Sequence, residues 1–384
     1  MPSPYYFQLT TQIIYGRYSA SQIGKVAGNL GVRKAMIVTD IGVAKAGVLN
    51  QILPPLKEAG IATVIFDEVE PNPTVQTVDR AAAQYSQEGC DGVIAVGGGS
   101  PLDAGKAVGV LATNPGSAAD YLGIDKVKNP CAPVIGVPTT AGTSAEITDV
   151  AVLSDPTKKA KIGLRSAYVA PRVALLDPIL TLGLPPEPTR DSGLDTLTHA
   201  IEAFISVNAW SASDVLALKA IELVGQHLRT AVHNGRDIEA RDGMLTASLL
   251  AGMAFHNTKL CLVHAITGPL GGFYNLPHGA INAIVLPHAM RFMLPGAVSK
   301  YVDIAVALGE VVEGLSEREA AEKAVQAVEQ LSRDVGLPRG LSHYGVKAED
   351  LPALSEAIAG SFMVPLSPRV AKKEDILAVC QAAL

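Results

Sequence analysis

The stretch DGVIAVGGGSPLDAGKAVG, residues 91–109, decides the fold. Its apolar first half is typical of a buried strand and runs directly into the glycines at 97–99, after which Ser100 and Pro101 open a helical pattern. Pro101 is expected at the first helical position, and Ser100 and Asp103 have the spacing of a capping box. The stretch therefore predicts a strand–turn–helix unit in which the strand is buried on both faces.

The glycine turn is suited to phosphate binding. Glycines at 97, 98 and 99 let a diphosphate approach bare backbone, and the N–H groups at the start of the following helix supply donors and a favourable dipole. The spacing is not G-x-G-x-x-G, because position 102 is Leu, so the usual Rossmann fingerprint is not met. From these residues alone, phosphate binding and a tight structural turn are equally good interpretations.

The rest of the chain changes character about halfway along. Before residue 184, Val- and Ile-rich runs alternate with Ala-rich helical stretches; beyond LGLPPEP, residues 182–188, helical periodicity dominates. We therefore expect an α/β dinucleotide-binding domain with a mostly parallel sheet over residues 1–184, followed by an all-α domain over residues 185–384. The further strand runs are KAMIVTD, TVIFDEV, APVIGVPTT and RVALLDP, and the helical windows are SASDVLALKAIELVGQHLRTAVH, EARDGMLTASLLAGMAF and EREAAEKAVQAVEQLSRDVG.

Composition excludes several classes of protein. The 384 residues are 48% hydrophobic and 18% charged, which is enough apolar surface for two cores. The net charge is −6 and the basic residues are scattered, which argues against nucleic-acid binding or an anionic membrane surface. The four cysteines are far apart, and no apolar run is long enough for a membrane span. These features predict a soluble globular protein of a reducing cytoplasm, without disulfides.

Polar side chains follow two other predicted strands. Asp40 ends the strand at 34–40, where its carboxylate could accept both ribose hydroxyls and repel a 2′-phosphate; the alternative is a helix N-cap. Thr139, Thr140 and Thr143 follow the strand at 132–138, where they suit phosphate contacts or their own backbone equally well. Asp40 in the first role predicts NAD rather than NADP.

The helical half contains a candidate metal site. Asp195 and His199 stand four residues apart in GLDTLTHAIEAF, so a helix places them on one face. His264 and His278 lie on either side of a Gly-Gly break and can join them from different elements. One carboxylate with three imidazoles suits Fe(II), Zn(II) or Co(II) rather than Mg²⁺ or Ca²⁺. Spacing alone leaves open a hydrogen-bonded Asp–His pair and structural histidines.

Several segments, in this order, resemble the iron-containing (group III) alcohol dehydrogenases, from about residue 12 to about residue 300. The resemblance implies a dinucleotide-binding α/β domain and an all-helical domain, the dehydroquinate synthase-like architecture, with the active site between them. It also implies Asp195, His199, His264 and His278 as metal ligands. The segments are QIIYGRYSA, GGGSPLDAGKA, VPTTAGTSAEIT, ALLDPILTLGLP, SGLDTLTHAIEA and LVHAITGPLGGFYNLPHGAINAIVLPH.

The same resemblance assigns residues to the NAD site. It implies Asp40 at the adenosine ribose and Gly97, Gly98 and Ser100 at the diphosphate. It further implies a set lining the adenine, diphosphate and nicotinamide-ribose side, although Lys161 could equally be a solvated charge beside Lys158 and Lys159. This set is Thr139, Thr140, Thr143, Lys161 and Leu180.

The implied activity is metal-assisted hydride transfer between NAD(H) and a small primary alcohol or diol and its aldehyde or ketone. Fe(II) is the expected ion and Zn(II) the alternative. No side-chain nucleophile is needed, because the ion lowers the pKa of the alcohol and polarises the carbonyl. Glycerol dehydrogenase and maleylacetate reductase remain alternatives within the superfamily. A dehydroquinate synthase-like lyase is an alternative from another class, and a non-catalytic metal-sensing or scaffold protein is a third.

One position departs from the family pattern. Many members have a second histidine four residues after the first histidine ligand of this segment, where this chain has Gly268. The change removes a candidate general acid and enlarges the space beside the metal. His256 and Lys259 precede the ligand and could face the substrate, or could be a capping histidine and a surface lysine. By analogy with the family's first strand, a homodimer or higher homo-oligomer is expected.

Overall fold

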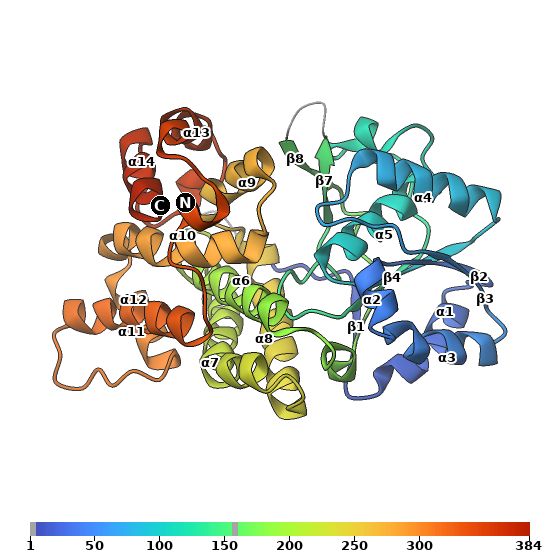
Figure 1. Cartoon of the computed structure of the whole chain (residues 1–384), viewed down its shortest axis with the longest axis horizontal. Coiled ribbons are helices and arrows are strands. Elements are labelled where there is room, and N and C mark those ends of the chain that lie inside the picture. Colours follow the sequence, from blue (N-terminus) through green and yellow to red (C-terminus); the bar gives the residue numbers. More distant parts are fainter. Residues whose placement is uncertain (1–4, 156–159) are drawn as a thin grey trace. The chain divides into compact units, whose positions relative to one another are not determined.

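The computed structural model describes residues 5–155 and 160–384, and these residues divide into two compact units. Residues 9–184 form an α/β unit, and residues 185–384 together with residues 5–8 form a helical unit. Figure 1 shows strands in the first unit and helices throughout the second. The predicted fold class, a parallel-sheet α/β region followed by a helical region, is confirmed.

The centre of the α/β unit is a six-stranded sheet in which every described pair is parallel. Its order is β1-β9-β6-β4-β2-β3, and all five predicted strand runs lie in it. From β2 the chain adds β3 on one side and then β4, β6 and β9 on the other. Sheets of this kind bind ligands in the crevice at such a switch point, which lies here between the neighbouring strands β2 and β4. The strands are β1 (Gln12–Tyr15), β2 (Lys34–Val38), β3 (Ala62–Phe66), β4 (Gly92–Gly97), β6 (Val134–Pro138) and β9 (Val173–Leu176).

Both faces of the sheet are covered, because successive side chains of a strand point to opposite sides. On β2, Met36 and Val38 join the apolar cluster that includes residues of α4 and α5, whereas Ala35 and Ile37 join the cluster that includes residues of α1 and α3. This explains why β4 is buried at all six positions. The helices are α1 (Ile23–Asn29), α2 (Ile41–Lys45), α3 (Leu53–Glu58), α4 (Val75–Gln87) and α5 (Gly99–Leu111).

A second, three-stranded sheet was not predicted. It has the order β5-β8-β7, with β5 (Gly123–Ile124), β7 (Val150–Asp155) and β8 (Ala160–Arg165), and β7 pairs antiparallel with β8. The burial of β7 alternates for most of its length, and β8 is only partly buried, so neither strand has the continuous apolar run that reveals the central strands. The two strands are recognisable mainly through their pairing with each other.

The helical unit contains no strand among residues 185–384. The three predicted helical windows correspond to α7, α8 and α12, and α7 covers its window completely. The most extensive packing is that of α7 against α8 and against α6, and these three helices are drawn next to one another in Figure 1. The helices are α6 (Pro186–Ile205), α7 (Ser211–His233), α8 (Ile238–Thr258), α9 (Leu262–Tyr274), α10 (His278–Met293), α11 (Val298–Ala307), α12 (Glu317–Asp334), α13 (Leu351–Ala359) and α14 (Lys373–Ala382).

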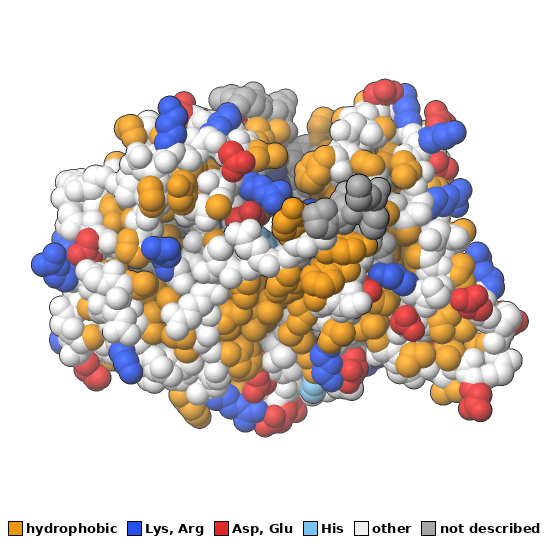
Figure 2. Space-filling view, turned by 180° about the vertical axis from the view of Figure 1, so that it is seen from behind, with side chains coloured by type: hydrophobic (Ala, Val, Ile, Leu, Met, Phe, Trp, Pro, Cys, Tyr) orange, Lys and Arg blue, Asp and Glu red, His pale blue; other side chains and the backbone are white. Residues whose placement is uncertain are grey.

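The surface charges are mixed. On the face shown in Figure 2, Lys and Arg side chains are interspersed with Asp and Glu. Among the described residues, no single helix is long and apolar enough to cross a membrane; α8 and α9, bent by 99° at their junction, reach that length and composition only when taken together.

Candidate metal and cofactor site

Asp195 and His199 lie one turn apart on α6, in a segment that is buried on all sides. Every residue from 193 to 205 is buried, because neighbouring helices surround this part of α6. Gly193 allows the close approach: a Cβ atom there would lie 2.3 Å from Cδ1 of Leu228 on α7. The apolar residues of the segment are thus accounted for by packing, and the carboxylate and the imidazole are enclosed with them.

His264 comes from α9, which follows a sharp break after α8. Lys259 forms that break with φ 64° and ψ 174°, a backbone region that is strained for any residue other than glycine. The change of direction brings the His264 ring against the His199 ring, with centroids 4.7 Å apart and planes 19° from parallel. Phe255 of α8 stacks on His199 at 4.5 Å, so both imidazoles are held by ring contacts.

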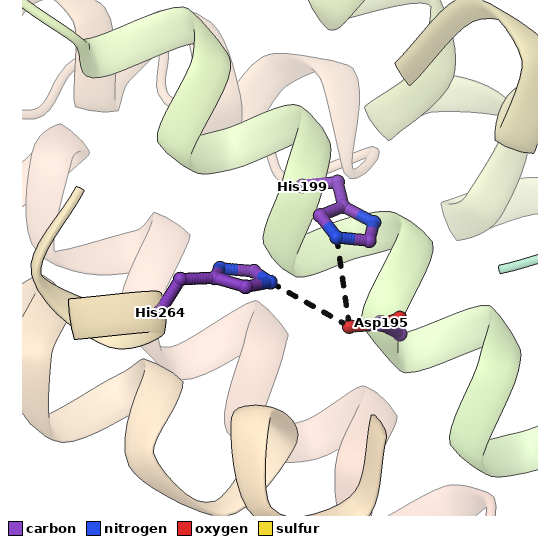
Figure 3. A group of neighbouring side chains, drawn as sticks. All are labelled: Asp195, His199 and His264. Atoms are coloured by element: carbon purple, nitrogen blue, oxygen red, sulfur yellow. Dashed lines mark ion pairs between the residues drawn. The ribbon is translucent and has the colours of Figure 1, made fainter. Parts of the chain in front are cut away.

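Three of the four predicted metal ligands meet in this structure. The distances from Oδ1 of Asp195 to Nε2 of His199 and to Nε2 of His264 are both 3.9 Å, and ligand atoms of the three residues lie within 4.8 Å of one another. Figure 3 shows the two rings directed at the same carboxylate. All three side chains are buried, with exposed fractions of 2%, 5% and 6% for Asp195, His199 and His264.

The fourth predicted ligand, His278, begins α10 and reaches the cluster through Asn282, one turn later. Nδ2 of Asn282 lies 2.7 Å from Oδ1 of Asp195 and 3.1 Å from Nε2 of both His264 and His278. The rings of His264 and His278 are 5.3 Å apart. The next residue, Gly279, lets α10 approach α6, because a Cβ atom there would be 2.3 Å from the carbonyl oxygen of Asp191.

Two polar residues of this cluster were missed in the sequence. Asn282 is fully buried, and its Oδ1 accepts a hydrogen bond from the hydroxyl of Thr267. Glu202 is also fully buried; its carboxylate lies 2.6 Å from Nδ1 of His264 and accepts the N–H of Val263 at 2.6 Å. A signal was present for Glu202, because it follows His199 by three residues and so shares its helix face. Asn282 is likewise four residues after His278.

Predicted cofactor residues gather at the carboxyl edge of the sheet. Asp40, Gly98 and Thr139 follow the ends of the neighbouring strands β2, β4 and β6, and the N–H of Thr139 donates to the carbonyl of Gly97 at 2.9 Å. Gly97 has φ 150°, which favours glycine. Asp40 also caps α2, because its Oδ1 accepts the N–H of Val43 at 2.9 Å.

The threonines pack beside the glycine turn. A Cβ atom at Gly98 would lie 3.3 Å from Cγ2 of Thr140, and one at Gly99 would lie 2.9 Å from Cγ2 of Thr143. The two loops are therefore in contact because both glycines lack a side chain. The first turn of α5 has half-exposed residues at 98–100, so its backbone donors can be reached by a ligand.

The predicted capping box at the start of α5 is wrong. The helix begins at Gly99 with Gly98 as N-cap, and no side chain caps it. The carboxylate of Asp103 instead pairs with the buried amine of Lys106 at 2.8 Å and accepts the N–H of Val152. Ser100 accepts the N–H of Asn72. Pro101 consequently occupies the third helical position rather than the first, still within the turn whose N–H groups have no helical partner.

Lys161 and Leu180 occupy different surroundings. Lys161 lies on β8 opposite Ser154, and burial lowers its pKa to about 8. Leu180, in the short 3-10 helix Pro178–Thr181, is 3% exposed and packs in the apolar cluster with Val96 and Leu175. Lys158 and Lys159 lie outside the described residues.

His256, Lys259 and Gly268, the residues suggested for the substrate pocket, differ in their surroundings. The amine of Lys259 donates to the carbonyl oxygen of His256, which is in the last turn of α8. Gly268 lies one turn after His264 on α9, and a Cβ atom there would meet no heavy atom within 4 Å. The missing histidine thus leaves open space on the face of α9 that carries His264.

Comparisons with known proteins identify the family of the chain. The family model "Iron-containing alcohol dehydrogenase" matches residues 10–178, and the model "Fe-containing alcohol dehydrogenase family, C-terminal" matches residues 189–384. The 1,3-propanediol dehydrogenase of Klebsiella pneumoniae is 42% identical over 96% of both chains, and the NAD-dependent methanol dehydrogenase of Bacillus methanolicus is 38% identical over 97% of both. A crystal structure of a 1,3-propanediol oxidoreductase has a TM-score of 0.96 at 41% identity and covers both chains completely. The chain belongs to the iron-containing alcohol dehydrogenase family.

Proposed function

We propose that the chain binds a divalent ion through Asp195, His199, His264 and His278 and uses it to interconvert a small primary alcohol or diol and its aldehyde or ketone. Membership of the family makes the chain an oxidoreductase of alcohols and aldehydes that uses NAD and iron. The observation that carries the residue assignment is the meeting of a buried carboxylate and two buried imidazoles within 4.8 Å.

The residues fit a divalent ion on chemical grounds. Asp195 is enclosed, and its ion pairs are with imidazoles rather than with Lys or Arg. A buried carboxylate needs a compensating charge, which a divalent cation supplies. Neutral imidazoles and one carboxylate form a borderline donor set, which favours Fe(II), with Zn(II) as the alternative, over Mg²⁺ or Ca²⁺.

NAD binding is supported by the carboxyl edge of the sheet. We propose that Gly97, Gly98 and Ser100 receive the diphosphate, where the first turn of α5 offers N–H donors and the positive end of the helix dipole. Asp40 at the end of β2 would meet the ribose and disfavour a 2′-phosphate through charge repulsion. The remaining proposed contacts are Thr139, Thr140, Thr143, Lys161 and Leu180.

The chemistry that the two cofactors supply when bound is Lewis acidity from the ion and hydride acceptance or donation from NAD(H). The protein contributes placement and a low dielectric. Asp195, His199 and His264 are buried, so a charge that develops beside them is poorly screened by water. Open space beside Gly268 provides room near His264 for a substrate chain or a water molecule that relays a proton.

A metal and substrate experiment tests this proposal. We expect anaerobically purified protein to contain one metal ion per chain and to reduce small aldehydes with NADH when Fe(II) is added. His264→Ala should lose both the metal and the activity, because His264 supplies Nε2 to the cluster. A protein without stoichiometric metal, together with full activity of His264→Ala, would contradict the assignment. A panel of primary alcohols and diols would then define the substrate.

The dehydroquinate synthase-like alternative would need free basic side chains for a phosphorylated acid. Arg190 donates to Asp191 at 2.7 Å and to the carbonyl of Gly336, and Lys259 donates to His256. These two basic side chains are therefore already engaged, which favours the dehydrogenase.

We also propose a cytoplasmic homo-oligomer. All four cysteines are free thiols, as suits a reducing compartment. β1 lies at one edge of the six-stranded sheet and exposes Tyr15. An edge strand with an exposed aromatic side chain is a suitable surface for pairing with a second copy. Light scattering of the purified protein would show a monomer if this proposal is wrong.

A further inference from the structure

We propose that Glu202 is a positioning residue that holds His264 in the tautomer required for metal binding, with the proton on Nδ1 and the lone pair on Nε2. The inference rests on the proposed metal site. It concerns a residue that is not one of the proposed ligands but contacts the His264 ring at Nδ1, the nitrogen on the far side from the cluster. Metal-binding imidazoles commonly depend on such a hydrogen-bonded partner.

Nδ1 of His264 faces the carboxylate of Glu202. Glu202 is fully buried, and its Oε1 accepts the N–H of Val263 at 2.6 Å while its Oε2 lies 2.6 Å from Nδ1 of His264. The backbone N–H of His264 also points to Oε2, at 3.4 Å. These donors belong to the first turn of α9, whose N–H groups have no helical acceptor. Both carboxylate oxygens of Glu202 face N–H donors, so the ring nitrogen that lies 2.6 Å from Oε2 is assigned as a donor and Nδ1 carries the proton.

The contacts of Nε2 of His264 independently indicate the same tautomer. The carboxylate of Asp195 can only accept, so the Asn282 atom that faces it at 2.7 Å must be the amide nitrogen. The hydroxyl of Thr267 donates to the other amide atom, which agrees with that orientation. The same nitrogen lies 3.1 Å from Nε2 of His264. It also lies 3.1 Å from Nε2 of His278, so its second hydrogen is shared between the two rings. An amide nitrogen cannot accept a hydrogen bond, so a proton on Nε2 of His264 would face no acceptor there, which again assigns the proton to Nδ1.

The consequence is a ligand ring that needs no reorientation to bind a metal. Nε2 of His264 already faces Oδ1 of Asp195 at 3.9 Å, and an ion between them would take the place of the Asn282 amide contact. The N–H groups of Val263 and His264 on α9 donate to the carboxylate of Glu202 on α6, which fixes the carboxylate beside Nδ1. Contacts from both helices therefore set the orientation of the His264 ring.

Glu202→Gln is the discriminating variant. The N–H of Val263 still needs an acceptor, so the amide oxygen must take the Oε1 position and the amide NH₂ must face Nδ1. His264 would then accept at Nδ1 and carry its proton on Nε2, where it blocks metal binding. Glu146→Gln is the matched control, because Glu146 is also buried, at 1% exposure, but lies in the α/β unit and is not a predicted ligand.

The experiment measures Zn²⁺ affinity of the full-length apoprotein by competition with a chromophoric chelator. We expect Glu202→Gln to bind Zn²⁺ about 10- to 100-fold more weakly than the parent and Glu146→Gln to match the parent. An affinity of Glu202→Gln within about threefold of the parent, at equal helix content by circular dichroism, overturns the inference. Equal Zn²⁺ affinity of the parent and His264→Ala would instead refute the proposed metal site.

A second measurement does not depend on any variant's folding. Nitrogen-15 chemical shifts of the histidine rings in the unmodified apoprotein distinguish a protonated from an unprotonated ring nitrogen, with His264→Ala identifying the signal. We expect a protonated Nδ1 and an unprotonated Nε2 for His264. A proton on Nε2 with none on Nδ1 overturns the inference even if Glu202→Gln cannot be purified.

Discussion

Gly279→Ala should push the ligand helices α6 and α10 apart without replacing any of the proposed ligand residues. Gly279 follows His278 on α10, and a Cβ atom there would lie 2.3 Å from the carbonyl oxygen and 2.8 Å from the carbonyl carbon of Asp191. It would also lie 3.3 Å from Cβ of Asp195. Two of these neighbours are backbone atoms, so no rotation of a side chain can relieve the contact.

The geometry sets the size of the effect. Ordinary contact between such atoms is at about 3.5 Å, so α10 and α6 must separate by roughly 1 Å at Gly279. Metal–ligand distances tolerate only about ±0.2 Å, so His278 would be displaced well beyond that range relative to Asp195. Overpacking of this kind costs about 1–3 kcal/mol of the free energy of unfolding. A metal affinity lower by about 10- to 100-fold is expected.

Gly268→Ala is the matched control, because Gly268 is also helical but has no heavy atom within 4 Å of the added methyl position. Alanine there should raise the free energy of unfolding by about 0.5–1 kcal/mol through its higher helix propensity. Urea unfolding of both apoproteins and Zn²⁺ competition provide the comparison. If Gly279→Ala proves as stable as Gly268→Ala and binds Zn²⁺ as tightly as the parent, the close approach of α10 to α6 does not position His278.

Three further predictions concern other parts of the chain. Asp40→Asn should keep the cap of α2, because Asn also accepts the N–H of Val43. Loss of the negative charge should raise kcat/KM for NADPH relative to kcat/KM for NADH. An unchanged ratio would show that Asp40 acts only as a helix cap. Lys259→Gly should be more stable to urea than Lys259→Ala by about 1 kcal/mol, because only glycine adopts φ 64° and ψ 174° without backbone strain. If Lys259→Ala leaves the kinetic constants for all carbonyl substrates unchanged, Lys259 does not line the substrate pocket. Burial lowers the pKa of Lys161 from its ordinary value near 10.5 to about 8. Between about pH 8 and pH 10.5 the unfolded chain therefore binds more protons at this amine than the folded protein does, so the free energy of unfolding increases as pH rises. Lys161→Met should lose that gain in a comparison of thermal unfolding at pH 7.5 and 9.5, and equal pH dependence in the two proteins would show that the amine is not buried in solution.

Much of the fold follows from short-range patterns. The central strands are continuous Val- and Ile-rich runs because they are buried on both faces, and α7 and α12 repeat apolar residues at helical period because each buries one side. The small sheet was not predicted because its strands are stabilised by pairing with each other rather than by a continuous apolar run. The capping box at Ser100 failed for a related reason: a buried ion pair with Lys106 holds Asp103 away from the helix N-terminus.

The candidate site divides in the same way between local and long-range causes. Helical spacing alone places Asp195 and His199 on one face of α6, because it depends only on residues four apart. The groups that complete the cluster are selected by tertiary packing: His264 contacts Glu202 across 62 residues, and Asn282 contacts Asp195 across 87. Those contacts depend on the strained break at Lys259 and on the missing side chains of Gly193 and Gly279, which let the helices approach. Helix packing distances arise from all the side chains at each crossing, and a pattern of neighbouring residues does not contain them.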